Sequence, residues 1–431
     1  MRVLIHGIDF SPVEVGIGKY TGEMAKWLTL RGHQVRVVTI APHFPQWKTF
    51  DGYSWWRYSR EVSLPGNGST GSLKVTRCPA WIPGDPRGWK RILHLASFAL
   101  SSVPVMLPQV LWRPDIVLVI EPTMFCAPHA LFVSMATGST SWLHVQDFEM
   151  DAAFQLGGLP SRLRRLADAT ERFLMSRFDR VSTISDRMIQ RLSDKGVSSA
   201  RSMLLPNWVD TSVIYPAAAG ATALRRKLGI SDRAIVALFS GSMGTKQGLH
   251  LLVDASRRLA SRADIQFVFC GDGPYRETLV AEKGDNVTIL PLQPADRLNE
   301  LLNLADIHLL PQLADAADLV MPSKLTGMMA SGRPVVATAH TETQLASVLE
   351  GRGLVTRPGD VDDFVSAITK LAEDVNLRSA MGKAARQYAV EHMDRGEVLN
   401  RFEVAIRETC SRTKTPKESI ASTSKERLPL S

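Results

Sequence analysis

The chain has 431 residues, which is long for one hydrophobic core and predicts two domains. With 45% hydrophobic and 22% charged residues, the composition is that of a folded protein and excludes a disordered one. Most of the formal net charge of +8 falls in residues 1–200. These cations could face anionic lipid or an anionic acceptor, or they could simply be solvated surface charge. The basic residues do not form a recognised nucleic-acid module, which argues against nucleic-acid binding.

Short apolar runs alternate with helical patterns through the first half, which is typical of βαβ units. We expect strands at 3–6, 35–40, 116–120, 141–145, 181–184 and 203–205, with helices over 21–30 and 163–178. Residues 43–90 are rich in tryptophan and are predicted to form a long irregular loop with a function. Residues 92–112 are nearly long enough to span a membrane, but their prolines and glutamine favour a buried or interfacial helix.

The strand pattern restarts in the second half, at 235–239, 265–270, 287–290, 307–310 and 334–338. The predicted fold class is therefore α/β, with two facing Rossmann-like, doubly wound parallel-sheet domains and a cleft between them. We expect the domains at 1–208 and 209–410, with the last helix packing back on the first domain. Residues 411–431 are rich in Ser, Thr, Lys and Pro and are predicted to be a disordered tail.

Two turns that follow strands suit phosphate groups. The run from Val236 to Val253 combines a buried strand, a glycine-rich turn with Lys246, and the start of a helix. Backbone N–H groups, a helix N-terminus and an ammonium group then surround one spot, as a diphosphate requires. Gly16, Gly18 and Lys19 form a second such turn, although it lacks the dinucleotide fingerprint and allows a purely structural interpretation.

Five segments in chain order resemble the retaining GT-B glycosyltransferases of family four, over nearly the whole chain apart from the tail. They are residues 16–18, 205–210, 241–248, 271–274, and 322–324 followed by 329–335. Residues 44–47 and 143–148 are similar to the bacterial exopolysaccharide branch, in particular the colanic-acid fucosyltransferases.

The resemblance implies transfer of a sugar from a nucleotide diphosphate sugar to a lipid-linked saccharide acceptor in exopolysaccharide biosynthesis, with retention. It also implies no cofactor and no obligatory metal, in agreement with the sequence, where no Asp-x-Asp motif follows a strand in a metal-ligand context. Protein cations and N–H groups would then stabilise the leaving diphosphate. GDP-fucose is the donor that the finer resemblance suggests, and a UDP-sugar is the close alternative.

The resemblance places Lys246 on the donor phosphates. Relatives carry Arg or Asn where this chain has Ser242, and Lys324 after Ser323 is a candidate to restore that charge. The simpler interpretation of Lys246 is a solvated lysine at a loop tip, and that of Lys324 is a surface lysine at the start of a helix. The turns after the other strands would border the nucleotide, and their residues are Gly241, Gly271, Asp272, Gly273 and Leu292.

The chain departs from the family at the acidic pair. Gly327 stands where relatives carry the second glutamate, so the usual carboxylate contact to the ribose is missing. Asp315 falls where the first glutamate is expected, and Asp315 or Asp318 is a candidate to contact the donor sugar. The alternative is that both are exposed loop aspartates.

Relatives place a histidine close to the transferred sugar, in the segment after the strand 141–145. One alignment matches it to His144, while another puts Gln146 there and keeps Asp147. Because the leaving phosphate can accept the acceptor proton, this group would orient and polarise rather than abstract a proton. The alternative for His144 is a core histidine satisfied by the backbone, and Glu121 is a weaker pocket candidate.

The helix over 162–177 carries several arginines among apolar residues and, with Trp81, Trp89 and Lys90, is a candidate for peripheral contact with the inner membrane face. An ordinary packing helix is the alternative. No signal-peptide pattern is present and the four cysteines make no CxxC spacing, so we expect free thiols and a cytoplasmic location.

Two other functions remain open at this point. One is a nucleotide-sugar epimerase or sugar-phosphate synthase on the same fold, although no carboxylate pair for proton abstraction is evident. The other is a non-catalytic subunit that binds a nucleotide or carbohydrate, which Ser242 and Gly327 favour.

Overall fold

The computed structural model describes residues 1–63, 70–86, 88–122, 124–148, 164–244, 247–313 and 321–414. The chain divides into two compact units. The first consists of Met1–Leu205 and the segment that starts at Leu399, and the second is Pro206–Val398. The boundary lies at 205/206, a few residues before the expected 208/209, and the end of the last helix belongs to the first unit.

The first unit is built on an eight-stranded sheet of order β3-β4-β2-β1-β5-β6-β7-β8. Its strands are β1 (Arg2–Gly7), β2 (Gln34–Ile40), β3 (Ser59–Ser63), β4 (Ser72–Cys78), β5 (Ile116–Ile120), β6 (Thr140–Val145), β7 (Arg180–Thr183) and β8 (Ser202–Leu204). Its helical segments are α1 (Gly16–Leu30), α2 (Trp89–Met106), α3 (Gln109–Trp112), η1 (Met124–Cys126), α4 (Ala127–Thr137), α6 (Arg164–Ser176) and α7 (Asp186–Asp194).

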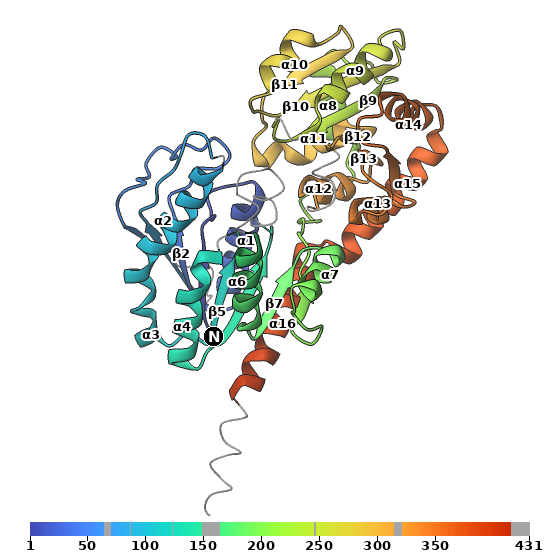
Figure 1. The fold of residues 1–431 in the computed structure, drawn as a ribbon. Helices are drawn as coiled ribbons and strands as arrows, with labels where there is room; N and C mark the ends of the chain where they lie inside the picture. Colours follow the sequence, from blue (N-terminus) through green and yellow to red (C-terminus); the bar gives the residue numbers. More distant parts are fainter. Residues whose placement is uncertain are drawn as a thin grey trace, which may run out of the picture. The chain divides into compact units, whose positions relative to one another are not determined.

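The central strands of this sheet are continuous apolar runs because helices cover both faces, as Figure 1 shows for α1, α2 and α4. All pairings are parallel except β3 with β4, which is antiparallel. The expectation of an irregular loop over 43–90 is therefore wrong in part. Charged residues interrupt the apolar alternation in both β3 and β4, which hides these edge strands in the sequence.

The last helix, α16 (Arg395–Lys414), completes the core of the first unit. The ring of Phe402 packs edge-on against Trp142 of β6, with 5.3 Å between the ring centroids. Residues 411–414 are helical, so this part of the predicted disordered tail is wrong. Residues 415–431 lie outside the described residues.

The second unit has a six-stranded sheet of order β11-β10-β9-β12-β13-β14, and all its pairings are parallel. Its strands are β9 (Ile235–Ser240), β10 (Ile265–Cys270), β11 (Val287–Leu290), β12 (Ile307–Leu310), β13 (Val335–Thr338) and β14 (Gly353–Thr356). Its helical segments are α8 (Ala218–Lys227), α9 (His250–Arg258), α10 (Arg276–Glu282), η4 (Ala295–Arg297), α11 (Leu298–Leu304), α12 (Lys324–Ala330), α13 (Gln344–Leu349), α14 (Val361–Glu373) and α15 (Val375–His392).

The order of the strands fixes where a ligand site can form in the second unit. From β9 the chain winds outward through β10 and β11, and then returns to β12 on the other side and winds through β13 and β14. The direction of winding therefore reverses between β9 and β12. In doubly wound sheets, ligands bind beyond the carboxyl ends of the strands at such a switch point.

No described helix has both the length and the apolar character that crossing a bilayer requires. The apolar stretch over 92–112 forms most of α2 and all of α3, and His94, Phe98 and Met106 are buried against the sheet. All four cysteines are buried free thiols, as expected from their spacing.

Candidate functional site

The loops after β9 and β12 meet at the switch point of the second unit. A Cβ placed on Gly248 would lie 3.4 Å from the carbonyl carbon of Gln312, and the φ of Gly248 is +63°. The loop of Gln312 is in turn fixed to β13, because its N–H donates to the Thr338 hydroxyl at 2.6 Å. The glycine-rich segment is thus held directly against the neighbouring strand end.

Glycines allow the loops after β9 and β10 to touch along their backbones. A Cβ on Gly271 would lie 1.9 Å from the carbonyl oxygen of Gly241, and one on Gly273 would lie 2.7 Å from the carbonyl oxygen of Met243. The Met243 N–H donates to the Asp272 carbonyl at 2.8 Å. Glycine is therefore required at these positions because two backbones approach closely, whether or not a ligand binds.

Lys324 brings a cation to this edge of the sheet from the start of α12. Its Nζ donates to the side-chain oxygen of Gln247 at 2.7 Å and lies 4.4 Å from the centre of the Phe239 ring. A longer contact of 3.4 Å reaches the carbonyl oxygen of Ser242. Burial lowers the pKa of the Lys324 ammonium to about 7.

The surroundings of Lys324 suit an anion. An amide oxygen, a carbonyl oxygen and an aromatic face stabilise the ammonium only in part, and none of them neutralises it. Among the described residues Lys324 makes no ion pair with a carboxylate. A phosphate that entered here would supply the missing negative charge and would raise the pKa of the lysine again.

Gln247 and Gln312 are polar residues of this site that the sequence did not single out as ligands. The buried Oε1 of Gln312 has no hydrogen-bond partner among the described residues, so it is available to a donor group. The signal for Gln247 was its place beside Lys246 in the glycine-rich run. No signal marked Gln312, which only the pairing of β12 with β9 brings to Gly248.

The other expected nucleotide-side residues lie in the same set of loops. Ser242 and Asp272 are exposed, Leu292 is 56% exposed in the loop after β11, and Ser323 is half-buried just before α12. A Cβ on Gly327, on α12, would lie 3.2 Å from the Leu302 side chain, so a residue larger than glycine there must displace its neighbour. Lys246, Asp315 and Asp318 lie outside the described residues.

The segment with Gly16, Gly18 and Lys19 is not the open turn that the sequence predicts, because α1 already begins at Gly16. A Cβ on Gly18 would lie 2.7 Å from the Cβ of Val13, so this glycine lets the helix pack on the loop before it. Gly16 has a φ of +57° and Lys19 is half-buried.

His144 lies inside the sheet of the first unit, on β6, and is 1% exposed. Its Nδ1 is 2.9 Å from the Ser182 hydroxyl and its Nε2 is 3.1 Å from the amide of Gln146. Ser182 also accepts a hydrogen bond from Trp142 Nε1 at 2.9 Å. Burial lowers the pKa of His144 to about 4, so the ring is neutral at pH 7 and both its nitrogens are engaged.

This geometry gives His144 the character of a satisfied core histidine, which was the alternative interpretation, although side chains and not the backbone satisfy it. Gln146, which the second alignment favoured, follows directly beyond the strand, is 6% exposed and contacts His144. Asp147 comes next and is half-buried. Glu121 is buried at the end of β5, where its N–H donates to the carbonyl of His144 at 3.0 Å.

Within the described part of the chain, no group of His, Cys, Asp and Glu side chains is arranged to hold a metal ion. The cation that the structure does provide at the switch point of the second unit is Lys324. A lysine, side-chain amides and backbone groups come together there, which is a combination suited to an anionic group.

Comparison with known proteins identifies the family. Residues 221–388 match the family of glycosyl transferases group 1, and residues 15–208 match the glycosyl transferase 4-like domain. The chain belongs to the group 1 glycosyltransferases, and its fold is the GT-B fold, as the motifs predicted. It is 38% identical to the putative colanic acid biosynthesis glycosyl transferase WcaI of Escherichia coli K12, over 93% of this chain and 98% of that one.

Solved structures agree on the fold. Sucrose-phosphate synthase of Thermosynechococcus elongatus superimposes with a TM-score of 0.72 at 17% identity, over 96% of this chain and 100% of that chain. Anabaena HepE in complex with UDP superimposes with a TM-score of 0.68 at 16% identity, over 95% and 100% of the two chains. The predicted fold class of two Rossmann-like domains is confirmed.

Proposed function

We propose that this glycosyltransferase moves a sugar from a nucleotide diphosphate sugar, GDP-fucose or a UDP-sugar, to a lipid-linked saccharide acceptor. The name of the relative WcaI supports a role in exopolysaccharide biosynthesis of the colanic acid type. The UDP complex of HepE, and a second HepE structure with UDP-glucose, support a nucleotide sugar as the donor.

The observation that carries the proposal is the half-buried Lys324 at the switch point, held by Gln247 and by the ring of Phe239. A leaving diphosphate gains negative charge in the transition state, and a desolvated ammonium stabilises that charge more strongly than a solvated one. Lys246, which precedes Gln247 in the sequence and lies outside the described residues, is the second cation that we assign to the diphosphate.

We propose that the reaction retains the anomeric configuration and that the leaving phosphate takes up the proton of the acceptor hydroxyl. The buried, neutral His144 suits this scheme because it holds Gln146 in place instead of serving as a base. Asp147 and either Asp315 or Asp318 are proposed to contact the sugar. No metal is required in this proposal, because lysines and N–H groups carry the positive charge.

We place the enzyme on the cytoplasmic side of the membrane, where a lipid-linked acceptor is presented. The exposed face of α6 supports a peripheral contact, because Arg165, Leu166, Arg172 and Phe173 are all exposed on it. Arginines beside exposed apolar side chains are typical of helices that lie in a bilayer interface.

The test begins with thermal unfolding in the presence of UDP and GDP, because a ligand that binds only the folded state raises Tm. The matching nucleotide sugar is then incubated with lipid-linked acceptors, with and without EDTA, and the product is analysed by NMR. Acceptor-dependent release of the nucleotide with a retained anomeric configuration supports the proposal. An epimer formed from the donor alone, or donor binding without any release, would establish one of the alternatives.

A further inference from the structure

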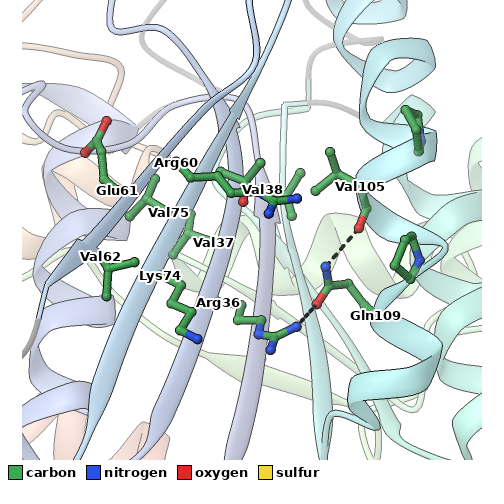
Figure 2. A pocket seen from close by; sticks show the side chains of 13 residues that line it. Arg36, Val37, Val38, Arg60, Glu61, Val62, Lys74, Val75, Val105 and Gln109 are labelled. Atoms are coloured by element: carbon green, nitrogen blue, oxygen red, sulfur yellow. Dashed lines mark hydrogen bonds between the residues drawn. The ribbon is translucent and has the colours of Figure 1, made fainter.

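A cavity of about 250 Å³ lies in the first unit between α2–α3 and the face of the sheet formed by β2, β3 and β4 (Figure 2). It is lined by Arg36 near the start of β2 and by Lys74 near the start of β4. In doubly wound sheets, substrates bind beyond the carboxyl ends of the strands, whereas these two residues lie near the starts of theirs. The cavity is therefore away from the edge where the catalytic site is expected.

The register of the strands gathers positive charge on one face of the sheet. Arg36 is paired with Lys74 on the neighbouring strand, and Arg60 of β3 is paired with Thr76 of β4. Since side chains alternate along a strand, Arg36, Lys74 and Arg60 all face the cavity. Figure 2 shows the Arg36 and Lys74 side chains extending in the same direction from adjacent strands.

This charge is not neutralised by the elements that surround the cavity. The five segments β2, β3, β4, α2 and α3 contain a single carboxylate, that of Glu61. Glu61 is also one of the residues that line the cavity, but its carboxylate pairs with Arg77 at 2.5 Å. Among the described residues, no carboxylate pairs with Arg36, Arg60 or Lys74.

Arg36 is held rigidly in this position. Its Nη1 donates to the side-chain oxygen of Gln109 at 2.9 Å, and its guanidinium lies 4.1 Å from the centre of the Trp112 ring. Gln109 is itself fixed by a bond of 2.8 Å to the carbonyl of Val105. Like charges directly opposite each other on neighbouring strands destabilise a sheet, so a preorganised pair of cations here favours binding of an anion.

The outer face of the same helices is apolar and exposed. Leu93, Leu100, Leu107 and Leu111 recur at helical spacing, with exposed fractions of 48%, 73%, 49% and 86%. Trp89, at the start of α2, continues this stripe and is 62% exposed. The helices that border the cationic cavity thus carry on their outer face a row of exposed leucines that begins with a tryptophan, which is the pattern of a surface that enters a bilayer interface.

We propose that the cavity between α2–α3 and the β2–β3–β4 face binds the phosphate of an anionic phospholipid, while the leucine stripe enters the bilayer. A bilayer satisfies both observations, because it presents phosphate groups and apolar surface together. A soluble phosphate would satisfy only the cations. The inference rests on the proposed membrane-side function and adds a second contact to that of α6.

Vesicle flotation with the full-length protein tests the inference, using phosphatidylcholine alone and phosphatidylcholine mixed with phosphatidylglycerol. The variant R60Q/K74Q removes two exposed cations of the cavity, and R226Q/K227Q removes two exposed cations of α8 in the second unit as the matched control. We expect about 30-fold weaker binding of R60Q/K74Q to the anionic vesicles and unchanged binding of the control. L100S/L111S, which changes two exposed leucines, should also weaken binding.

Further measurements separate the possible outcomes. Circular dichroism shows whether R60Q/K74Q is folded, and its affinity for the nucleoside diphosphate, which should be unchanged, shows whether the donor site is intact. Equal vesicle binding by R60Q/K74Q and the unaltered protein would overturn the proposal, as would loss of binding only in the α6 variant R165Q/R172Q. Inorganic phosphate that binds the cavity when vesicles do not would refute the lipid as its ligand.

Discussion

The Nζ of Lys324 and the Oε1 of Gln247 lie 2.7 Å apart, and this hydrogen bond joins the start of α12 to the glycine-rich segment after β9. Gln247 is neutral, so it orients the ammonium group without cancelling its charge. The lysine thus stays available to an anion while its position is fixed in advance.

Replacement of Lys324 by Met should weaken binding of the nucleoside diphosphate at least tenfold. The reason is that a hydrogen bond to a charged group contributes roughly 1.5–3 kcal/mol. Isothermal titration calorimetry with the nucleotide identified by thermal shift checks this. The control is Arg226→Gln, which removes an exposed cation of α8 outside the site. Equal affinities of K324M and the unaltered protein would remove Lys324 from the phosphate site.

The pH dependence of nucleotide binding should report the same lysine. Without ligand the pKa of Lys324 is about 7, and a bound diphosphate raises it, so binding above pH 7 takes up a proton. Affinity should therefore fall as pH rises above 7, and calorimetry in buffers of different ionisation enthalpy should detect the proton uptake. Both effects should be absent in K324M.

Because of Lys324, the free energy of unfolding should rise with pH, whereas the nucleotide affinity should fall. The folded-state pKa lies below that of the unfolded chain, so between about 7 and 10.5 the unfolded state binds more protons. Relative to K324M, the unaltered protein should therefore become more stable as pH rises through this window. Urea unfolding at several pH values measures the difference, and a flat difference would contradict the desolvation of the lysine.

Replacement of Gly271 by Ala should destabilise the second unit by roughly 2 kcal/mol or more, because strained backbone and a rigid clash must both be relieved. The added Cβ would meet the carbonyl oxygen of Gly241 at 1.9 Å, and both backbones are held by hydrogen bonds, from Gly241 N–H to Cys270 and from Gly271 N–H to Leu290. Gly84→Ala is the matched control, since a Cβ there meets nothing within 4 Å. Thermal or urea unfolding compares the two variants, and equal stability would refute the close approach of the loops.

Replacement of Glu403 by Gln should lower stability at neutral pH and should lower it less at pH 3. Burial acts to raise the pKa of Glu403, but hydrogen bonds from Arg407, His33 and Arg31 lower it to about 2. The contribution of the carboxylate is therefore present above its unfolded pKa of 4.5 and is lost as pH falls toward 2. Unfolding of E403Q and the unaltered protein at pH 7 and pH 3 measures this, and a pH-independent difference would contradict it.

The sequence predicts most of the fold because buried parallel strands are continuous apolar runs, as β5 and β9 are. It misses β3 and β4 because Arg60, Glu61 and Lys74 interrupt the apolar pattern of these edge strands. It also misses β14, where a short run of partly buried residues begins with Gly353.

The candidate site was less accessible to sequence reasoning. Lys324 and the glycine turns are recognisable because their spacing after strands is local. The place of Gln312 in the site depends on which strands become neighbours. The burial that lowers the pKa of Lys324 depends on Phe239 and Gln247 around it. The structural reason for Gly271, contact with the carbonyl of Gly241, likewise arises only when β9 and β10 pair.

Because Phe402 and Glu403 belong to the first unit but lie near the end of the chain, they also affect the order in which the two units can fold during synthesis. Residues 206–398 are translated as one uninterrupted unit, whereas the first unit needs residues from both ends of the chain. Trp142 gains its aromatic partner, and His33 its carboxylate, only after the second unit has been synthesised. The first unit, although translated earlier, is thus the last to acquire all its native contacts.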